Sequence, residues 1–451
     1  MAFLPKNLLS NESRRFLKQL IILSLPIMLQ EFISGMVNFA DIWMVGQLGV
    51  NYVNAVGFSG RLFFLFIILI FGVNSGSGVF MGQFWGSKNS SGIYKVMGIA
   101  FISNLIISLL FSAIAIFAPV WFLGILTSNE YVIALGVPYL RVMSISYLLS
   151  AVSATLVATL RAIRQTKLPM FASAIALTAK ILLNILFIFV LEYGIIGAAF
   201  ATIIARIIEI ALQLILIKRL NIPILAKPKA YFTADPKFIL HFFKVTLPII
   251  ANEGIWALGV FMYDIFYQFA GNYAQGAVQI SENLSHMFLV FGISAGAGAA
   301  VIISNTLGEK DTTRAISYAK KSLFVGIIFG IVLGLLIFAL APIILSTYNV
   351  DESVRIMARN NLYVVAIMAF IRITNYFFII SILRSGGDTL YCLIVDVGCV
   401  WFIGVPMAFL GAYVLQLPIY FVVAMVNMEE LAKFLINIVR FKQNKWANTL
   451  V

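Results

Sequence analysis

Long apolar runs separated by short polar stretches make up most of this chain of 451 residues. Each run has about 20 residues, the length that an α-helix needs to cross the hydrocarbon core of a bilayer. The runs do not alternate apolar and polar residues, as strands of a membrane barrel would. The pattern therefore predicts an all-α membrane protein with twelve transmembrane helices. We place these roughly at 16–40, 59–82, 96–119, 132–158, 169–190, 194–217, 242–268, 278–304, 320–345, 355–382, 388–411 and 416–438.

Composition agrees with this pattern, because 62% of the residues are hydrophobic and only 11% are charged. A water-soluble domain has no use for so much apolar surface. The first run is long and is not followed by a small-residue cleavage site. We therefore expect it to remain in the protein as the first span.

The net charge of +13 reflects topology. Most of the 31 Lys and Arg residues fall at the N-terminus, in loops after even-numbered spans and at the C-terminal end, among them Lys6, Arg161, Arg384 and Lys433. The opposite loops hold Arg355 and Arg359. The positive-inside rule then predicts a multi-pass protein of the plasma (inner) membrane with both termini in the cytoplasm. The basic residues are scattered, so we expect the lipid bilayer and no nucleic acid as a partner.

The stretch LPIMLQE at 25–31 returns as LPIIANE at 247–253, 222 residues later. Other residues recur at the same or nearly the same offset: Glu31 and Glu253, Gln83 and Asn305, Lys88 and Lys310, and Arg161 and Arg384. The chain therefore reads as two six-helix bundles related by a parallel internal repeat. We expect an N-terminal bundle at 1–217, a cytoplasmic linker at 218–241 and a C-terminal bundle at 242–451. A substrate site is expected between such repeats, near the midplane.

Ionisable groups inside the apolar runs are the candidate chemistry, because each costs several kcal/mol in lipid unless it has a partner or a wet cavity. Glu31, Asn38 and Asp41 lie on one side of the first span. Glu253 and Asp264 share a face of the seventh span, since eleven residues bring a helix back to within about 20°.

Other intramembrane charges have structural interpretations. Arg206 and Glu209 are spaced as an ion pair within one helix. We expect Lys180 to neutralise Asp41 or Glu31.

Asp396 would similarly pair with Arg372. Counting the charges within the spans leaves a negative surplus in the second half of the chain. We therefore place a cation or proton site around Glu253, Asp264 and Glu282.

Four stretches together resemble one known family. They are PIMLQEFISGMVNFADIWMVGQLG in the first span, GQFWGSKN after the second, LRAIRQTKLPM after the fourth and LRSGGDTLY after the tenth. With twelve spans in two halves, they are similar to the multidrug and toxic compound extrusion family over nearly the whole chain. The resemblance implies an antiporter that exports organic cations and amphipathic xenobiotics, driven by Na+ or H+.

The resemblance also assigns roles to residues. Asp41 matches the acid of the family's D-x-x-M-V-G context and would couple to a cation or proton, and Glu253 is the candidate acid of span 7. In span 10 the chain departs from members that have an aspartate and offers Arg372 and Asn375 instead.

These arguments define the expected sites. The ion or proton coupling residues are Glu31, Asp41, Glu253 and Asp264. The substrate cavity would be lined by Asn38, Lys180, Asn184, Asn252, Trp256, Tyr263, Glu282 and Asn375. We expect alternating access by a monomer with no enzymatic activity, no cofactor and no metal beyond a transported Na+. The alternative is a lipid-linked oligosaccharide or lipid flippase of related architecture, although the acidic second half argues against its cationic cavity.

Overall fold

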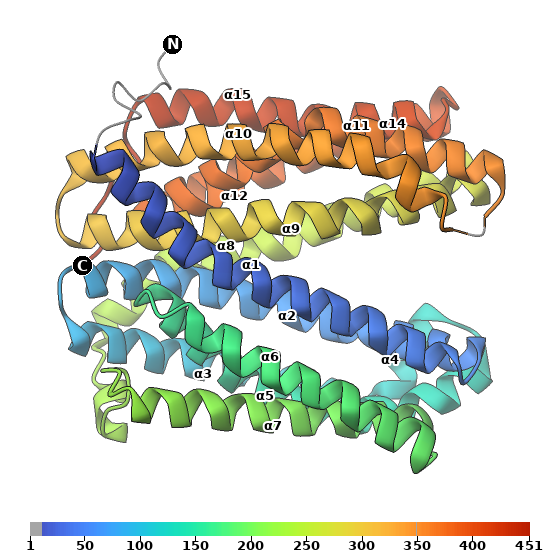
Figure 1. The fold of residues 1–451 in the computed structure, drawn as a ribbon, viewed down its shortest axis with the longest axis horizontal. Coiled ribbons are helices and arrows are strands. Elements are labelled where there is room, and N and C mark those ends of the chain that lie inside the picture. The colour runs from blue at the N-terminus through green and yellow to red at the C-terminus, as the bar shows by residue number, and fades with distance from the viewer. Residues whose placement is uncertain (1–10, 349) are drawn as a thin grey trace. The chain divides into compact units, whose positions relative to one another are not determined.

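The structure is a computed structural model that describes residues 11–348 and 350–451, and every regular element within these ranges is helical (Figure 1). Residues 1–10, including Lys6 of the basic N-terminus, lie outside the described residues. The first half contains α1 (Asn11–Gly46), α2 (Val50–Gly86), α3 (Ser90–Phe117), α4 (Pro119–Leu126), α5 (Glu130–Ala162), α6 (Lys167–Asn184), η1 (Ile185–Val190), α7 (Gly194–Arg219) and η2 (Pro228–Phe232). The second half contains α8 (Pro236–Tyr267), η3 (Gln268–Ala270), α9 (Asn272–Gly308), α10 (Thr312–Leu345), α11 (Glu352–Tyr376), η4 (Phe377–Leu383), η5 (Arg384–Gly386), α12 (Thr389–Cys399), η6 (Val400–Gly404), α13 (Val405–Phe409), η7 (Leu410–Val414), α14 (Ile419–Val426) and α15 (Met428–Lys442).

Eleven helical segments within the described residues are long and apolar enough to cross a membrane, and they correspond to the first eleven expected spans. The chain is a multi-pass membrane protein. The twelfth expected span, 416–438, is divided between α14 and α15, with Asn427 between them. Glu429 and Glu430 open α15, so this segment does not have the length and apolarity of the other eleven.

The chain divides into two compact units. The N-unit is Leu29–Ile250, and the C-unit is Met1–Met28 together with Ala251–Val451. These bounds differ from the expected bundles at 1–217 and 242–451, because the start of α1 belongs with the second half of the chain. The start of α8 belongs with the first half. Each of these two helices thus contributes to both units.

A proline lies just before each boundary. The division falls two residues after Pro26 in α1 and two residues after Pro248 in α8. Proline removes a backbone donor and its ring clashes with the preceding turn, which loosens a helix at that point. The recurrent proline therefore marks the place where the helix passes from one unit to the other.

Glycine contacts repeat at the same offset. In the N-unit, a Cβ added to Gly76 of α2 would lie 2.6 Å from Cγ2 of Thr246 in α8. In the C-unit, a Cβ added to Gly298 of α9 would lie 2.1 Å from Oγ of Ser24 in α1. Both pairs are related by 222 residues. Small residues allow membrane helices to approach closely, so the two contacts seat the start of α1 and of α8 in the same way.

Two turns also repeat. Lys88 and Lys310 have positive φ angles of 58° and 62°, a conformation that non-glycine residues seldom adopt. The next residue in each case, Asn89 or Asp311, caps the following helix by accepting a backbone N–H bond. Local structure thus follows the sequence repeat.

Each unit has its own apolar interior. In the N-unit, α5 packs against α2, α3 and α7, and the rings of Phe66 and Tyr147 stack with centroids 5.1 Å apart. In the C-unit, α11 packs against α9 and α10, and Phe377, Phe378 and Trp446 are almost fully buried. These interiors hold the charged groups described below.

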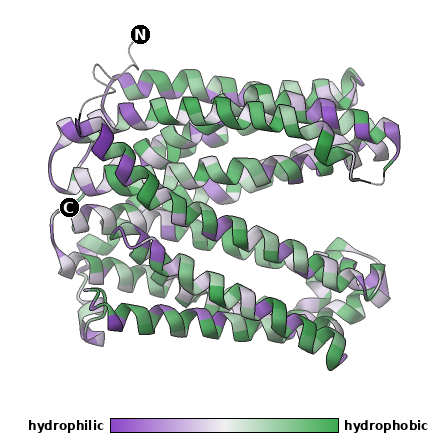
Figure 2. Cartoon of the chain, in the orientation of Figure 1, coloured by the Kyte–Doolittle hydropathy of each residue, from purple (hydrophilic) through white to green (hydrophobic). Residues whose placement is uncertain are grey.

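Apolar residues also cover the outside of the helices, as the hydropathy colouring in Figure 2 shows. Phe117 is 84% exposed and Phe402 is 83% exposed. Large apolar side chains so exposed are at home against lipid tails.

Candidate functional site

The recurrent glutamate of the N-unit is held by an arginine. Glu31 lies on α1, and its Oε1 is 2.9 Å from Nη2 of Arg161 near the end of α5. The same Nη2 donates to Oε1 of the neighbouring Gln30 at 2.8 Å. The side chains are partly open, with 24% of Arg161 and 40% of Glu31 exposed.

The C-unit repeats this triad. Nη1 of Arg384 is 2.8 Å from Oε1 of Glu253 on α8, and Nη2 donates to Oδ1 of Asn252 at 2.6 Å. Here the side chains are only 3% and 16% exposed. The expectation that Arg384 is a loop cation is therefore wrong, since the π-helical segment η4 leads this arginine into the unit's interior. Each copy of the repeat buries a glutamate beside an equivalent arginine.

A chain of polar contacts continues from the first triad. Gln30 donates from Nε2 to Oγ of Ser173 at 2.8 Å, and Ser173 donates to Oε1 of Glu209 at 2.6 Å. Oε2 of Glu209 lies 2.7 Å from Nη1 of Arg206, so the predicted ion pair is confirmed. The N-unit network thus joins two carboxylates to two guanidinium groups.

Asp41 forms a separate cluster with α6. Lys180 Nζ donates to Asp41 Oδ2, which identifies the expected partner of this lysine as Asp41. Asn184 Nδ2 donates to Asp41 Oδ1 at 2.5 Å. Asn184 lies directly before the π-helical segment η1, a departure from α-helical geometry of the kind often found at functional sites. The carboxylate is therefore balanced by one ammonium group and held by one amide.

Lys433 is the centre of the C-unit network. Its side chain is 2% exposed, and Nζ lies 2.8 Å from Oδ1 of Asp396. The same Nζ lies 3.7 Å from Glu429 and 3.8 Å from Glu430. Asp396 also accepts a hydrogen bond from Asn252 at 3.2 Å, which connects Lys433 with the triad of this unit. Asp396 thus pairs with Lys433 and not with Arg372, as we had expected.

Side chains of α8 and α11 complete this network. Tyr263 donates from its hydroxyl to Oε2 of Glu429 at 2.6 Å. Asn375 donates to Oε2 of Glu430 at 2.7 Å, and Nε of Arg372 lies 3.9 Å from Oε1 of the same glutamate. Oδ1 of Asn375 is buried and has no hydrogen-bond partner among the described residues. The network therefore keeps one spare acceptor beside its carboxylates.

The balance of charge differs between the units. The contacts of the C-unit network join four carboxylates, those of Glu253, Asp396, Glu429 and Glu430, to three cations, those of Arg372, Arg384 and Lys433. One negative charge is left over. By contrast, the contacts of the N-unit balance every carboxylate that they join.

Sequence reasoning missed Glu429, Glu430 and the role of Lys433, because these residues were read as the cytoplasmic end of an apolar span. Their i, i+3 and i, i+4 spacing was the available signal. Within the described residues, no three His, Cys, Asp or Glu side chains are arranged to hold a metal ion.

The comparisons with known proteins agree with the fold. The MatE family model matches residues 26–186 and 229–410, once in each half of the chain. The chain belongs to the MatE family. This confirms the resemblance seen in the sequence motifs.

Relatives of this MatE protein span most of its length. It is 21% identical over 401 residues to the "Probable multidrug resistance protein YoeA" of Bacillus subtilis, covering 87% of this chain and 86% of that one. It is 22% identical over 426 residues to the "Probable multidrug resistance protein NorM" of Thermotoga maritima, with 92% and 89% covered.

Solved structures share the MatE fold. A variant of the MATE transporter VcmN of Vibrio cholerae matches with a TM-score of 0.89 at 18% identity, covering 97% of this chain and 100% of that chain. A MOP superfamily transporter of Pyrococcus furiosus matches with a TM-score of 0.85 at 17% identity, covering 95% and 96%. The latter is described as having a binding pocket of reverse polarity that suggests a different function.

The expected site residues of this MatE protein fall into three groups. Lys180 and Asn184 contact Asp41, and Asn252, Tyr263 and Asn375 belong with Glu253 to the C-unit network. Glu282 of α9 is exposed and interacts electrostatically with Asp264 and Arg372. Asn38 is exposed on α1, and the half-buried Trp256 packs against an apolar cluster of the C-unit.

Proposed function

We propose that this chain is an antiporter that exports organic cations and amphipathic xenobiotics by alternating access, driven by inward flow of Na+ or H+. Family membership supports transport, and NorM and MepA, two of its relatives, carry the names "Probable multidrug resistance protein" and "Multidrug export protein". The chain acts as a monomer and as a transporter, not an enzyme, and the ion that it moves is its sole inorganic requirement.

The proposed topology has twelve spans, with α14 and α15 together forming the last. Burial of Glu429, Glu430 and Lys433 within the C-unit supports this, because the polar side chains of α15 then face protein and not lipid. Two six-span repeats, 1–217 and 242–451, are joined by the segment 218–241. That segment and both termini lie on the cytoplasmic side of the plasma (inner) membrane.

The surplus negative charge of the C-unit network is the observation that carries the proposed coupling. A carboxylate left unbalanced in a low dielectric costs several kcal/mol, so the network favours taking up one Na+ or one proton. Glu430 is the natural acceptor, because its nearest cations lie at 3.8 and 3.9 Å. The spare Oδ1 of Asn375 is an oxygen ligand of the kind that a hard cation prefers. Glu253 and Asp264 take part as neighbouring charges.

The N-unit carboxylates have a different part in this scheme. Asp41 and Glu31 are already balanced by Lys180 and Arg161, so an incoming ion would first have to displace a protein cation. We therefore assign the driving ion to the C-unit.

Transport follows from mutual exclusion. Uptake of the ion neutralises the network and weakens the hold on a cationic substrate, whereas release of the ion restores the attraction. Substrate contacts are assigned to the open side chains of Asn38, Trp256 and Glu282. The buried residues Lys180, Asn184, Asn252, Tyr263 and Asn375 position the acids.

Charge also separates this function from that of a flippase for lipid-linked oligosaccharides. The reverse polarity described for the pocket of the Pyrococcus furiosus transporter indicates that this fold accommodates binding pockets of opposite polarity. The side chains, and not the fold, therefore decide the substrate. A cavity for pyrophosphate needs surplus positive charge, whereas the C-unit network has a surplus of negative charge.

The test uses purified protein in liposomes loaded with a fluorescent organic cation, with either a Na+ gradient or a pH gradient imposed. We expect efflux to follow one of the gradients in the wild type. Glu430→Gln removes the surplus charge and should abolish the dependence on the gradient while the protein stays folded. Glu352→Gln, which removes an exposed carboxylate of α11, is the matched control and should behave as the wild type.

Three other outcomes would contradict the proposal. Efflux that ignores both gradients in the wild type would favour the flippase. Coupling that survives Glu430→Gln would exclude the C-unit site. Coupling that survives Glu430→Gln but fails in Asp41→Asn would move the site to the N-unit.

A further inference from the structure

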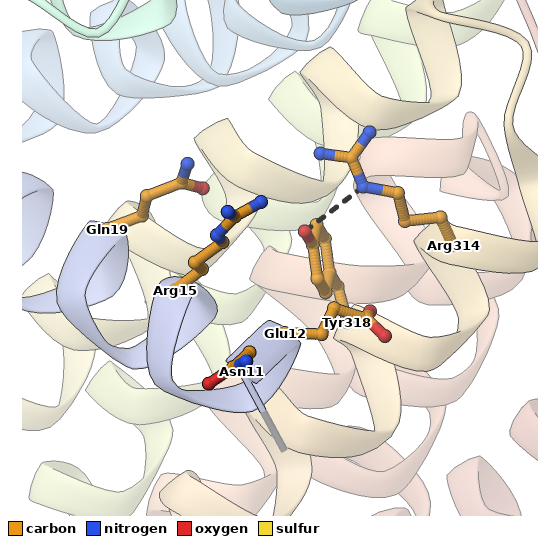
Figure 3. Close-up of a pocket in the computed structure, with 6 residues that line it drawn as sticks. All are labelled: Asn11, Glu12, Arg15, Gln19, Arg314 and Tyr318. Atoms are coloured by element: carbon orange, nitrogen blue, oxygen red, sulfur yellow. Dashed lines mark hydrogen bonds between the residues drawn. The ribbon is translucent and has the colours of Figure 1, made fainter.

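A cavity of about 460 Å3 lies in the C-unit between the beginnings of α1 and α10, apart from the charged networks (Figure 3). All of its lining side chains are polar, and they are those of Asn11, Glu12, Arg15, Gln19, Arg314 and Tyr318. None of these residues takes part in the proposed transport mechanism.

Arg314 is fixed in place at this cavity. Its Nε donates to the hydroxyl of Tyr318 at 3.1 Å, and its Cζ lies 5.3 Å from the centre of the tyrosine ring. Its Nη1 is 3.0 Å from Oε2 of Glu309. A guanidinium group held on an aromatic face is pre-organised for a planar anion.

Arg15 brings a second guanidinium group to the same cavity from α1, as Figure 3 shows. Among the residues that the structure describes, Arg15 forms no ion pair with a carboxylate. Glu12, the acid of the lining, lies 3.0 Å from Nζ of Lys321 and is balanced by that cation. The cavity therefore has a surplus of positive charge.

Position along the helices places the cavity at the edge of the bilayer. In α10, Lys321 is the last charged residue before the uncharged stretch Ser322–Leu345. Arg314 precedes this stretch by eight residues, which is about 12 Å along the helix axis. Arg15 lies about as close to the apolar part of α1. Both guanidinium groups are thus at the depth of lipid headgroups.

An apolar surface continues from the cavity. Ile22 lies on the same face of α1 as Arg15 and Gln19, one turn deeper, and is 46% exposed. A ligand with an anionic head and an apolar tail would satisfy both regions.

We propose that this cavity binds the phosphate of an anionic phospholipid headgroup. The two guanidinium groups contact the phosphate, the amides of Asn11 and Gln19 hydrogen-bond to the rest of the headgroup, and an acyl chain follows Ile22. Free inorganic phosphate has the same anionic chemistry but lacks the tail, which is the basis for distinguishing the two sources.

The experiment uses the full-length protein, purified in detergent and depleted of lipid. Its unfolding midpoint is measured while phosphatidylglycerol, phosphatidylcholine or inorganic phosphate is added, and bound lipids are counted by native mass spectrometry. We expect a saturable rise in the midpoint with phosphatidylglycerol alone. Arg15→Gln combined with Arg314→Gln should weaken that binding about 30-fold, as expected for two interfacial arginines.

A matched control removes the same charge from the same two helices outside the cavity lining. Arg14→Gln combined with Lys320→Gln should bind phosphatidylglycerol as the wild type does. Equal weakening in the control would overturn the proposal in favour of general electrostatic attraction. An equal effect of inorganic phosphate would replace the lipid by a soluble anion. If loss of Arg314 unfolds the protein, the exposed Arg15→Gln alone should still weaken binding, and unchanged binding there would overturn the site.

Discussion

The two units contain the same triad in different surroundings. Glu31 and Arg161 are partly exposed, and their network is balanced in charge. Glu253 and Arg384 are buried and connect through Asn252 and Asp396 to Lys433 and two further acids. A duplication has thus preserved a contact while its surroundings diverged. In a buried network the neighbours, more than the pair itself, decide what the loss of a charge costs.

The largest effect is expected at the lysines. Lys433→Met would leave three buried carboxylates without their common cation and should cost about 5 kcal/mol of unfolding free energy or prevent folding. Lys180→Met leaves one carboxylate that still accepts a bond from Asn184 and is partly exposed, so we expect about half that cost. Titration with a denaturing detergent, followed by circular dichroism, measures both.

Paired substitutions sharpen this contrast. Asp41→Asn should restore most of the stability that Lys180→Met removes, because the pair is isolated. Asp396→Asn should restore only part of the loss in Lys433→Met, since Glu429 and Glu430 remain. Equal restoration in both cycles would mean that Lys433 has a single effective partner.

The triads should show the next largest difference. Arg384→Gln leaves Glu253 buried without its cation and should cost about 3–5 kcal/mol. Arg161→Gln affects a half-exposed pair and should cost about 1 kcal/mol. Thermal unfolding midpoints of the two variants in the same detergent measure the difference. Similar losses would show that the triads are energetically equivalent despite their different burial.

A smaller effect is expected at the paired glycines. Gly76→Ala places a methyl group against the branched Thr246, whose Cβ is 2.9 Å away, and should cost about 1–3 kcal/mol. Gly298→Ala meets mainly the hydroxyl of Ser24, which rotates more freely, so a smaller loss is expected. Unfolding midpoints again give the comparison. A larger loss in Gly298→Ala would indicate that the serine cannot move.

The smallest effect should come from the repeated helix caps. Asn89→Ala and Asp311→Ala each remove an acceptor for one backbone N–H group, at 3.0 and 2.9 Å. Each should cost about 1 kcal/mol. Hydrogen exchange of the first turns of α3 and α10 would report faster opening in the corresponding variant. Faster exchange across a whole unit would contradict a local role.

Much of the fold was predictable because hydropathy and repetition are properties of the linear chain. Runs of about 20 apolar residues predicted eleven helical segments that the structure contains. The helix α15 was not resolved by this argument. Its charged residues face the interior of the C-unit, and hydropathy does not report the direction in which a side chain points.

The candidate site was predictable in part. Pairs within one helix, such as Arg206 and Glu209, follow from spacing alone. Asp41 and Lys180 were recognisable as partners because isolated charges in a membrane need compensation. The arginine of each triad was assigned to a loop instead. The offset that relates Glu31 to Glu253 also relates Arg161 to Arg384, and this was the signal that could have joined them.

The sequence by itself determined that this is a helical membrane protein of duplicated origin, with prolines and glutamates in corresponding spans. Tertiary structure decided which charges meet, because Arg384 contacts Glu253 across 131 positions of the chain and Lys433 contacts Asp396 across 37. It also decided that the start of α1 belongs to the C-unit. The physical reason is that apolarity and period fix a helix and its length, whereas rotation about the helix axis and choice of neighbour depend on packing against the rest of the chain.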